Sequence, residues 1–129
     1  MAAVLKKKGI KPDLIISSTA VRALEYAKIL AEELNYKKKN IVGEKELYIA
    51  TDNEMLEILR RTDDSNDTVF MIGHNPGITD FANSLCNYYL DNLPTSGIFG
   101  VNFDSDKWKD TDFGKGKFAS FDYPKKFIQ

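Results

Sequence analysis

Apolar positions along the chain follow two periods, and the stretches that show each period alternate. Short apolar runs rich in β-branched residues, typical of strands buried in a parallel sheet, lie at 14–18 and 68–73. After each run, apolar residues recur every three or four positions, as on the buried face of a helix. Alternating strands and helices of this kind predict an α/β fold with a mostly parallel sheet. We expect one domain spanning 1–129.

Several segments are expected to form strands. Leu14–Ser18 follows a Pro-Asp turn signal, Thr68–Gly73 is a buried run, and Ile41–Tyr48 lies between two helical patterns. In the tail, Ile98–Phe103 and Lys117–Tyr123 alternate apolar and polar residues with a period of two. These two segments flank a turn-rich stretch and therefore predict a closing strand pair.

Helices are expected between and before the strands. Ala20–Tyr36 carries a stripe of apolar residues at Ala20, Leu24, Ala27, Leu30, Ala31 and Leu34. Thr51-x-x-Glu54 is a capping box that opens the next helix. A third stripe consists of Ile78, Phe81, Ala82, Leu85 and Tyr89, with Pro76 in the first turn. Met1–Lys8, followed by Gly9, has the pattern of a helix end.

The composition fits a globular domain whose core needs neither metal nor disulfide. The 129 residues are 43% hydrophobic and 29% charged, and a chain of this length buries about 70% of its unfolded surface. Eighteen basic and nineteen acidic residues leave a formal net charge of -1. We therefore expect no general binding to nucleic acid.

Cys86 is the only cysteine and His74 the only histidine. A disulfide within the chain and a metal site of several histidines are therefore excluded, and we expect no metal or organic cofactor. Cys86 is expected to be a buried, neutral thiol on a helix. No apolar stretch reaches the roughly 20 residues that span a bilayer, and the charges near Met1 follow a short apolar run, the reverse of a secretory signal. We expect a cytoplasmic protein with no membrane partner.

Two side chains able to contact an anion follow the buried strands. Arg22 comes after 14–18 and His74 comes after 68–73, each near the start of the next helix. The carboxyl ends of parallel strands and the free N–H groups of helix N-termini favour anions, phosphate above all. Arginine adds a planar fork for phosphate oxygens, and histidine can hydrogen-bond them or stabilise charge during phosphoryl transfer. A surface arginine and a structural histidine are the alternative interpretations.

The segments around these residues resemble two hallmark motifs of the histidine phosphatase superfamily. They are Ser17-Ser-Thr-Ala-Val-Arg22-Ala-Leu-Glu-Tyr-Ala27 and Val69-Phe-Met-Ile-Gly-His74-Asn-Pro-Gly-Ile78. Pro94-Thr-Ser-Gly97 and Tyr123-Pro-Lys-Lys126 are similar to segments of its SixA-like phosphohistidine phosphatase branch. The resemblance implies a three-layer α/β/α fold of the phosphoglycerate mutase type, and hydrolysis through a phosphohistidine intermediate.

The resemblance also implies roles for the matched residues. Arg22 matches the second phosphate-binding arginine, and His74 matches the second histidine, which stabilises the phosphoryl group, so both are expected to be catalytic and phosphate-binding. The implied partner is a phosphate-bearing substrate, a phosphorylated histidine of a phosphorelay protein or a small phosphate ester. No residue matches an acid for the leaving group. Glu44, Glu46 and Glu54 lie in the right region, with helix capping or a surface position as their default roles.

The chain departs from the family at the nucleophile. The family's Arg-His-Gly or Arg-His-Ala motif, at the end of the first strand, occurs nowhere in this sequence, and there is no second histidine. We therefore expect an N-terminally truncated member that lacks the first strand, binds phosphate weakly and does not turn over by the family mechanism. A non-catalytic phosphate-binding or interaction module is the alternative function.

Family topology implies that the missing strand belongs in the middle of the sheet, beside 69–73. Its absence is expected to uncover an apolar edge, and such edges pair readily. We expect the chain to form a homodimer through this gap, to exchange elements between copies, or to fill the gap by shifting its C-terminal strand pair. Thr95 and Ser96 are candidates to supply hydroxyls near the pocket, with turn formation as the alternative.

Overall fold

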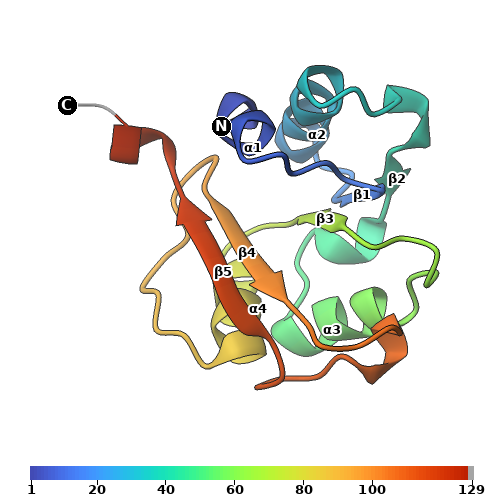
Figure 1. Ribbon diagram of the computed structural model, residues 1–129, viewed down its shortest axis with the longest axis vertical. Coiled ribbons are helices and arrows are strands. Elements are labelled where there is room, and N and C mark those ends of the chain that lie inside the picture. The colour runs from blue at the N-terminus through green and yellow to red at the C-terminus, as the bar shows by residue number, and fades with distance from the viewer. Residues whose placement is uncertain (128–129) are drawn as a thin grey trace.

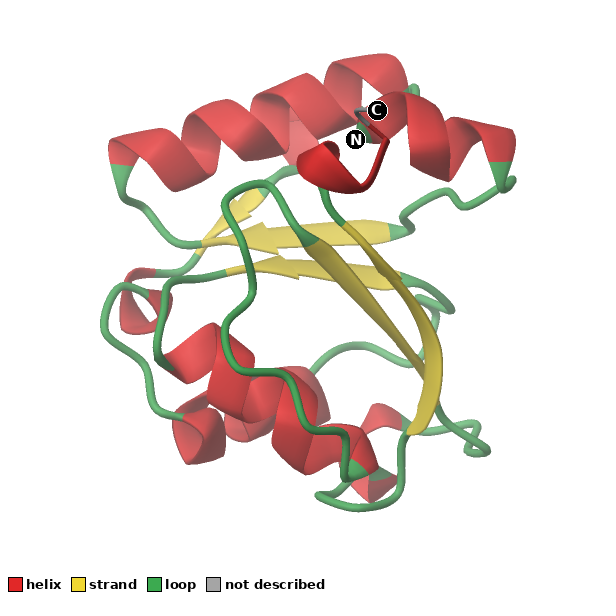
Figure 2. Cartoon of the chain, turned by 90° about the vertical axis from the view of Figure 1, so that its left-hand side faces the viewer, coloured by secondary structure: helices red, strands yellow, loops and turns green. Residues whose placement is uncertain are grey.

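The structure is a computed structural model, and it describes residues 1–127. A parallel sheet lies between two pairs of helices, and an antiparallel strand pair lies beside it (Figure 1, Figure 2). The helices are α1 Ala2–Lys7, α2 Val21–Glu33, α3 Asp52–Arg60 and α4 Gly77–Cys86. The strands are β1 Leu14–Ser17, β2 Val42–Gly43, β3 Val69–Ile72, β4 Ile98–Asn102 and β5 Lys117–Asp122. The α/β class and the closing strand pair are therefore as the sequence predicts.

The parallel sheet has the strand order β2-β1-β3. Its central strand β1 pairs with β3 over its whole length, from Leu14 opposite Val69 to Ser17 opposite Ile72. Because the strands are parallel, their carboxyl ends lie at the same edge of the sheet. The segments that follow β1 and β3 therefore meet at that edge.

The two faces of the sheet pack against different helices. Because successive strand residues point to opposite faces, Phe70 and Ile72 pack towards α1 and α2, whereas Val69 and Met71 pack towards α3 and α4. Buried residues on the first side are Leu5, Ala27, Leu30, Ala31 and Leu34. Those on the second side include Met55, Leu56, Phe81 and Leu85. The helices and sheet thus form three layers, visible edge-on in Figure 2.

The segment 41–48 is not the long strand that its apolar residues predict. Only Val42–Gly43 pairs with β1, and Lys45–Leu47 forms a 3-10 turn. Leu47 is fully buried, whereas Tyr48 is 56% exposed. The strand prediction was wrong here because a turn with charged residues directs one apolar side chain inward and the next to the surface.

Helix α4 ends earlier than the apolar stripe predicts. Asn87 adopts a left-handed conformation with φ +52° and caps the helix after Cys86. The Asn83 side chain forms hydrogen bonds with both backbone polar groups of Leu90. Its Nδ2 donates to the Leu90 carbonyl at 2.7 Å, and its Oδ1 accepts the Leu90 N–H at 2.9 Å. Tyr89 lies outside the helix and is 87% exposed, so its predicted place on the buried stripe was wrong.

The predicted capping box of α3 is present. Thr51 Oγ1 accepts the Glu54 N–H, and the Glu54 carboxylate accepts the Thr51 N–H. This exchange satisfies two backbone donors at the helix start and fixes where α3 begins. In the part of the chain that the structure describes, no helix is long and apolar enough to cross a membrane.

A gap separates the parallel sheet from the antiparallel pair. Within residues 1–127, β3 pairs only with β1, and β4 pairs only with β5. A cavity of about 950 Å³ lies between β3 and β4 and is lined by residues of both strands. The C-terminal strand pair has not shifted to close the gap, so that expectation was wrong. The homodimer and the exchange of elements stay predictions.

Candidate functional site

The carboxyl ends of β1 and β3 bring Ser18 and His74 into contact. The Ser18 N–H donates to the Ile72 carbonyl at 2.9 Å, which holds the residue after β1 beside the end of β3. His74 Nε2 lies 2.7 Å from Ser18 Oγ, and the same hydroxyl oxygen accepts the Ala20 N–H at 3.2 Å. Ser18 is fully buried and His74 is half-buried. Ser18 therefore fixes the direction of the imidazole through Nε2.

Tyr48 contacts the ring of His74. The two ring centroids lie 5.5 Å apart with an interplanar angle of 53°. Tyr48 reaches this position from the turn after β2, although most of its own ring faces solvent. The imidazole is therefore held both by a hydroxyl and by an aromatic neighbour.

Two glycines allow the turn around His74 to lie close to the rest of the fold. A Cβ at Gly77 would collide with the backbone carbonyl of Ala50, and a Cβ at Gly73 would lie 3.0 Å from Met55 Cε. Neither position has room for a side chain without movement. The glycines on either side of His74 thus set the path of the backbone that presents it.

Arg22 lies in the first turn of α2, the helix that follows Ser18. The residue is exposed, and its guanidinium forms no salt bridge with residues 1–127. Helix α2 starts at Val21 without a side-chain cap, so its first N–H groups have no side-chain partner. Arg22 and His74 line the same cavity. The structure therefore places an arginine without a salt bridge and an oriented imidazole in the lining of one cavity.

The loop 90–97 borders the cavity and is tied to the His74 turn. Asn75 Nδ2 donates to the Leu93 carbonyl at 3.0 Å, and the Leu93 N–H donates to Thr79 Oγ1 at 2.9 Å. Thr79 Oγ1 in turn donates to the Asn75 side-chain oxygen. These bonds join the residue after His74, the first turns of α4 and the loop into one unit.

The same loop is tied to α2 by Tyr26. The Tyr26 hydroxyl donates to the Ser96 carbonyl at 3.1 Å, and burial raises the pKa of Tyr26 to about 12. Thr95 and Ser96 line the cavity. Their hydroxyls remain candidates for contact with a ligand.

The predicted acidic candidates lie outside the cavity lining. Glu44 and Glu46 both pair with Arg61, at 3.1 and 3.6 Å, and Glu54 completes the capping box of α3. These are the default roles that the sequence analysis gave them.

Cys86 is half-buried rather than fully buried. Its thiol donates to the Ala82 carbonyl at 3.5 Å, and burial raises the pKa of the Cys86 thiol. The thiol is therefore neutral at physiological pH, as expected from its helix. Within residues 1–127, no group of three or more His, Cys, Asp or Glu side chains is arranged to hold a metal ion.

Sequence reasoning missed Ser18, Tyr48 and Tyr26 as neighbours of the site. Ser18 has a signal in the sequence, because it is the first polar residue after a buried strand. The Tyr26 contact joins residues 70 positions apart, and no local pattern reports such a contact. The contact of Tyr48 with His74 was not predicted, because 41–48 was expected to be a strand.

The fold can be compared with known proteins. No protein-family model and no curated protein sequence matches the chain. Among solved structures, a protein assigned as the phosphohistidine phosphatase SixA of Agrobacterium tumefaciens matches with a TM-score of 0.76 and 22% identity, over 95% of this chain and 75% of that chain. The chain has the SixA fold.

Two further solved structures have the same fold as this chain. A protein assigned as SixA of Nakamurella multipartitia matches with a TM-score of 0.78 and 16% identity, over 95% of this chain and 77% of that chain. The protein histidine phosphatase SixA complexed with tungstate matches with a TM-score of 0.76 and 21% identity, over 93% of this chain and 74% of that chain. The resemblance predicted from the sequence is thus confirmed at the level of the fold. A fold does not by itself determine the chemistry, which depends on the residues of the site.

Proposed function

We propose that Arg22 and His74 bind the phosphoryl group of a phosphate-bearing substrate, as part of a site of the phosphohistidine phosphatase type. The observation that carries this proposal is the joint placement of the two residues. They follow adjacent parallel strands and line one cavity. Free N–H groups at the start of α2 add to the preference for an anion.

Each side chain has a distinct part in binding. The guanidinium of Arg22 offers parallel donors to two phosphate oxygens. His74 offers Nδ1, because Ser18 engages Nε2. During phosphoryl transfer, charge spreads over the equatorial oxygens, and donors at these positions stabilise it. Ser18 acts through His74 and is a positioning residue.

The single histidine sets a limit on catalysis. The two-histidine route needs one imidazole as nucleophile and another to stabilise the phosphoryl group, and this chain has only His74. We assign His74 to stabilisation, so the chain on its own binds the phosphoryl group and does not hydrolyse it by that route. The same observation favours the second candidate function, a non-catalytic phosphate-binding or interaction module.

The proposed substrate is a phosphorylated histidine of a phosphorelay protein, and small phosphate esters are the alternative. The support for phosphohistidine is the fold, since the matching structures are described as phosphohistidine phosphatases. Placement in the cytoplasm remains a prediction from the sequence.

Calorimetric titration with tungstate, a tetrahedral oxyanion, tests the binding proposal. Arg22→Ala removes a charge-assisted contact and is expected to weaken binding by about 1–3 kcal/mol. Lys28→Ala is the matched control, because Lys28 is an exposed cation on the same helix and lies outside the cavity lining. We expect Lys28→Ala to bind like the unaltered chain. Equal weakening in both variants would mean that net charge, and not Arg22, holds the anion.

Hydrolysis assays test the assignment of His74 to stabilisation. With phosphoramidate and p-nitrophenyl phosphate, we expect no turnover by the unaltered chain above that of His74→Ala. Turnover that is lost in His74→Ala would contradict the assignment of His74 to stabilisation and would make it the nucleophile.

A further inference from the structure

We propose that Tyr48 is a specificity-determining residue, whose exposed ring contacts a planar ring that carries the phosphoryl group. The substrate class is therefore phosphoryl groups on aromatic or heteroaromatic rings. This inference rests on the proposed function, because it takes the phosphoryl group to be bound by Arg22 and His74. It concerns the part of the substrate that those two residues do not contact.

Tyr48 lies against His74 and leaves much of its own ring free. The two ring centroids are 5.5 Å apart, with an interplanar angle of 53°, and Tyr48 is 56% exposed. Among residues 1–127, His74 is the only residue whose ring contacts the ring of Tyr48. The tyrosine ring therefore keeps surface on which a second ring can lie.

The turn that presents Tyr48 is anchored on both sides. Leu47 before it is fully buried, and Ala50 after it is 7% exposed. The Tyr48 N–H donates to the Lys45 carbonyl at 3.1 Å, and the capping box of α3 begins at Thr51. Because the backbone is fixed before and after Tyr48, little conformational freedom is lost when a ligand contacts the ring.

The surface beside His74 carries other exposed apolar side chains. Ile49 is 84% exposed and Val21, which precedes Arg22, is 71% exposed. Val21 follows β1 and Ile49 follows β2, and these adjacent parallel strands end at the same edge of the sheet. Single exposed apolar residues are common, whereas apolar groups gathered beside a polar site are typical of ligand contacts.

A ring attached to the phosphorus atom is within reach of Tyr48. An oxygen that is hydrogen-bonded to an imidazole nitrogen lies about 2.8 Å from it, and the carrier group is bonded to the same phosphoryl group. Aromatic rings pair with their centroids about 4.5–7 Å apart. The phosphoryl oxygens can therefore contact His74 and Arg22 while the carrier ring contacts Tyr48.

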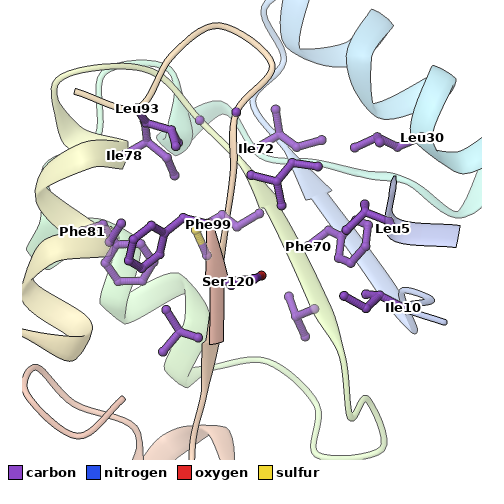
Figure 3. A pocket seen from close by; sticks show the side chains of 18 of the residues that line it. Leu5, Ile10, Leu30, Phe70, Ile72, Ile78, Phe81, Leu93, Phe99 and Ser120 are labelled. Atoms are coloured by element: carbon purple, nitrogen blue, oxygen red, sulfur yellow. The ribbon is translucent and has the colours of Figure 1, made fainter. Parts of the chain in front are cut away.

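The cavity between β3 and β4 is a different apolar surface. Ile78, Leu93 and Phe99 line it (Figure 3). Tyr48 and Ile49 are outside its lining, so a ring on Tyr48 stays outside the cavity. The two surfaces also differ in what they select. The faces and edges of two aromatic rings attract each other in addition to apolar contact, whereas the cavity favours any apolar group by burial alone.

Three phosphonates test the proposal by calorimetric titration: phenylphosphonate, cyclohexylphosphonate and methylphosphonate. The phenyl and cyclohexyl rings have the same number of carbon atoms, and only phenyl is planar. The quantity measured is the dissociation constant of cyclohexylphosphonate divided by that of phenylphosphonate. A difference in ionisation between the two ligands is the same for every variant, so a change in this ratio reports the contact with the altered side chain.

Two variants of Tyr48 separate the ring from its apolar bulk. Tyr48→Leu keeps an apolar side chain without the ring, and we expect the ratio to fall about three- to tenfold. Tyr48→Phe keeps the ring, and we expect an unchanged ratio. Tyr89→Leu is the matched control, because Tyr89 is 87% exposed and lies after α4, outside the cavity lining. We expect this control to bind like the unaltered chain.

The outcomes distinguish this proposal from the proposed function. If Tyr48 only holds His74 in place, Tyr48→Leu weakens binding of inorganic phosphate and of all three phosphonates alike, and the unchanged ratio overturns the proposal. An equal fall of the ratio in Tyr89→Leu would also overturn it, while phosphate binding would stand. Absence of binding of phosphate and of every phosphonate by the folded chain would overturn the proposed function, and this inference with it.

A further ligand distinguishes the two sources of a phosphoryl-bearing ring. N-acetyl-4-phosphonomethylphenylalanine amide carries its ring on a peptide backbone. Tighter binding than that of phenylphosphonate, lost in Tyr48→Leu, would support the proposal with a protein side chain as the carrier. Weaker binding, with the ratio still dependent on Tyr48, would support it with a free aryl phosphate as the carrier.

Discussion

The orientation of His74 depends on contacts that its own sequence motif does not contain. Arg22 and His74 could be found from the sequence, because each follows a buried strand and precedes a helix. The contact between Ser18 Oγ and His74 Nε2 could not, because it depends on how β1 and β3 are aligned. Local patterns therefore identify the candidate residues, and the register of the sheet determines which atoms they present.

Tyr26 provides a test at the residue scale. Its pKa is raised to about 12 from an ordinary value of 10.0 because the phenol is buried. The folded state therefore favours the protonated form. The resulting stability is complete below pH 10 and is lost as the pH rises from about 10 towards 12.

We expect Tyr26→Phe to have a flatter stability profile than the unaltered chain over that pH range. Near neutral pH, the variant loses the hydrogen bond to Ser96 and is expected to be less stable by about 0.5–1.5 kcal/mol. Urea unfolding at several pH values measures both effects. An identical alkaline loss of stability in the variant would show that another group causes it.

At the scale of elements, the strongest patterns were also the most reliable. β1, β3 and the capping box of α3 appear where the sequence predicts them, since runs of buried residues and a paired Thr and Glu are local signals. The predictions for the segment 41–48 and for the end of α4 were wrong because tertiary contacts determine the structure of both. Leu47 anchors a turn in the core, and Asn83 redirects the chain after α4.

Gly77→Ala tests how closely α4 approaches its neighbour. The new Cβ would collide with the Ala50 carbonyl, and relief requires movement of backbone on one side or the other. We expect a loss of about 1–3 kcal/mol in the free energy of unfolding, the scale of overpacking, and weaker tungstate binding because the His74 turn moves.

Gly43→Ala is the control for that change. Its Cβ would lie 3.4 Å from a Thr19 methyl carbon, an ordinary contact distance, so we expect a much smaller effect on stability. Urea unfolding of the two variants measures the difference. Similar losses of stability in the two variants would contradict this account. They would mean that replacing either glycine destabilises the chain for a reason other than the contact with the Ala50 carbonyl.

At the scale of the whole molecule, one ionic cluster joins the two ends of the chain across the gap. Asp122, at the end of β5, is buried and pairs with Lys8 after α1 and with Lys126. The Lys8 ammonium foremost, and Lys126 with it, hold the pKa of Asp122 below its usual range. The sequence predicted the layers of the fold, but it gave no sign of this long-range cluster.

The Asp122 cluster predicts a dependence of stability on acid. Because folding lowers the pKa of this carboxyl, its contribution is present above the ordinary pKa of 3.8 and is lost as the pH falls below that value. We expect Asp122→Asn to be less stable at neutral pH by about 1–3 kcal/mol, since it loses charge-assisted hydrogen bonds. Its stability should also change less between neutral pH and pH 3. Thermal unfolding across this range is the measurement, and parallel profiles for the two proteins would contradict the assignment.

The central claim is that His74 and Arg22 bind one phosphoryl oxyanion together. His74 is the only histidine, so the imidazole signals of protein labelled with nitrogen-15 histidine report on this site alone. In a titration with inorganic phosphate, we predict a saturable shift of the His74 ring nitrogens in the unaltered chain and in Lys28→Ala, and a much weaker response in Arg22→Ala. Absence of a shift in the folded chain, or an undiminished shift in Arg22→Ala, would contradict the account.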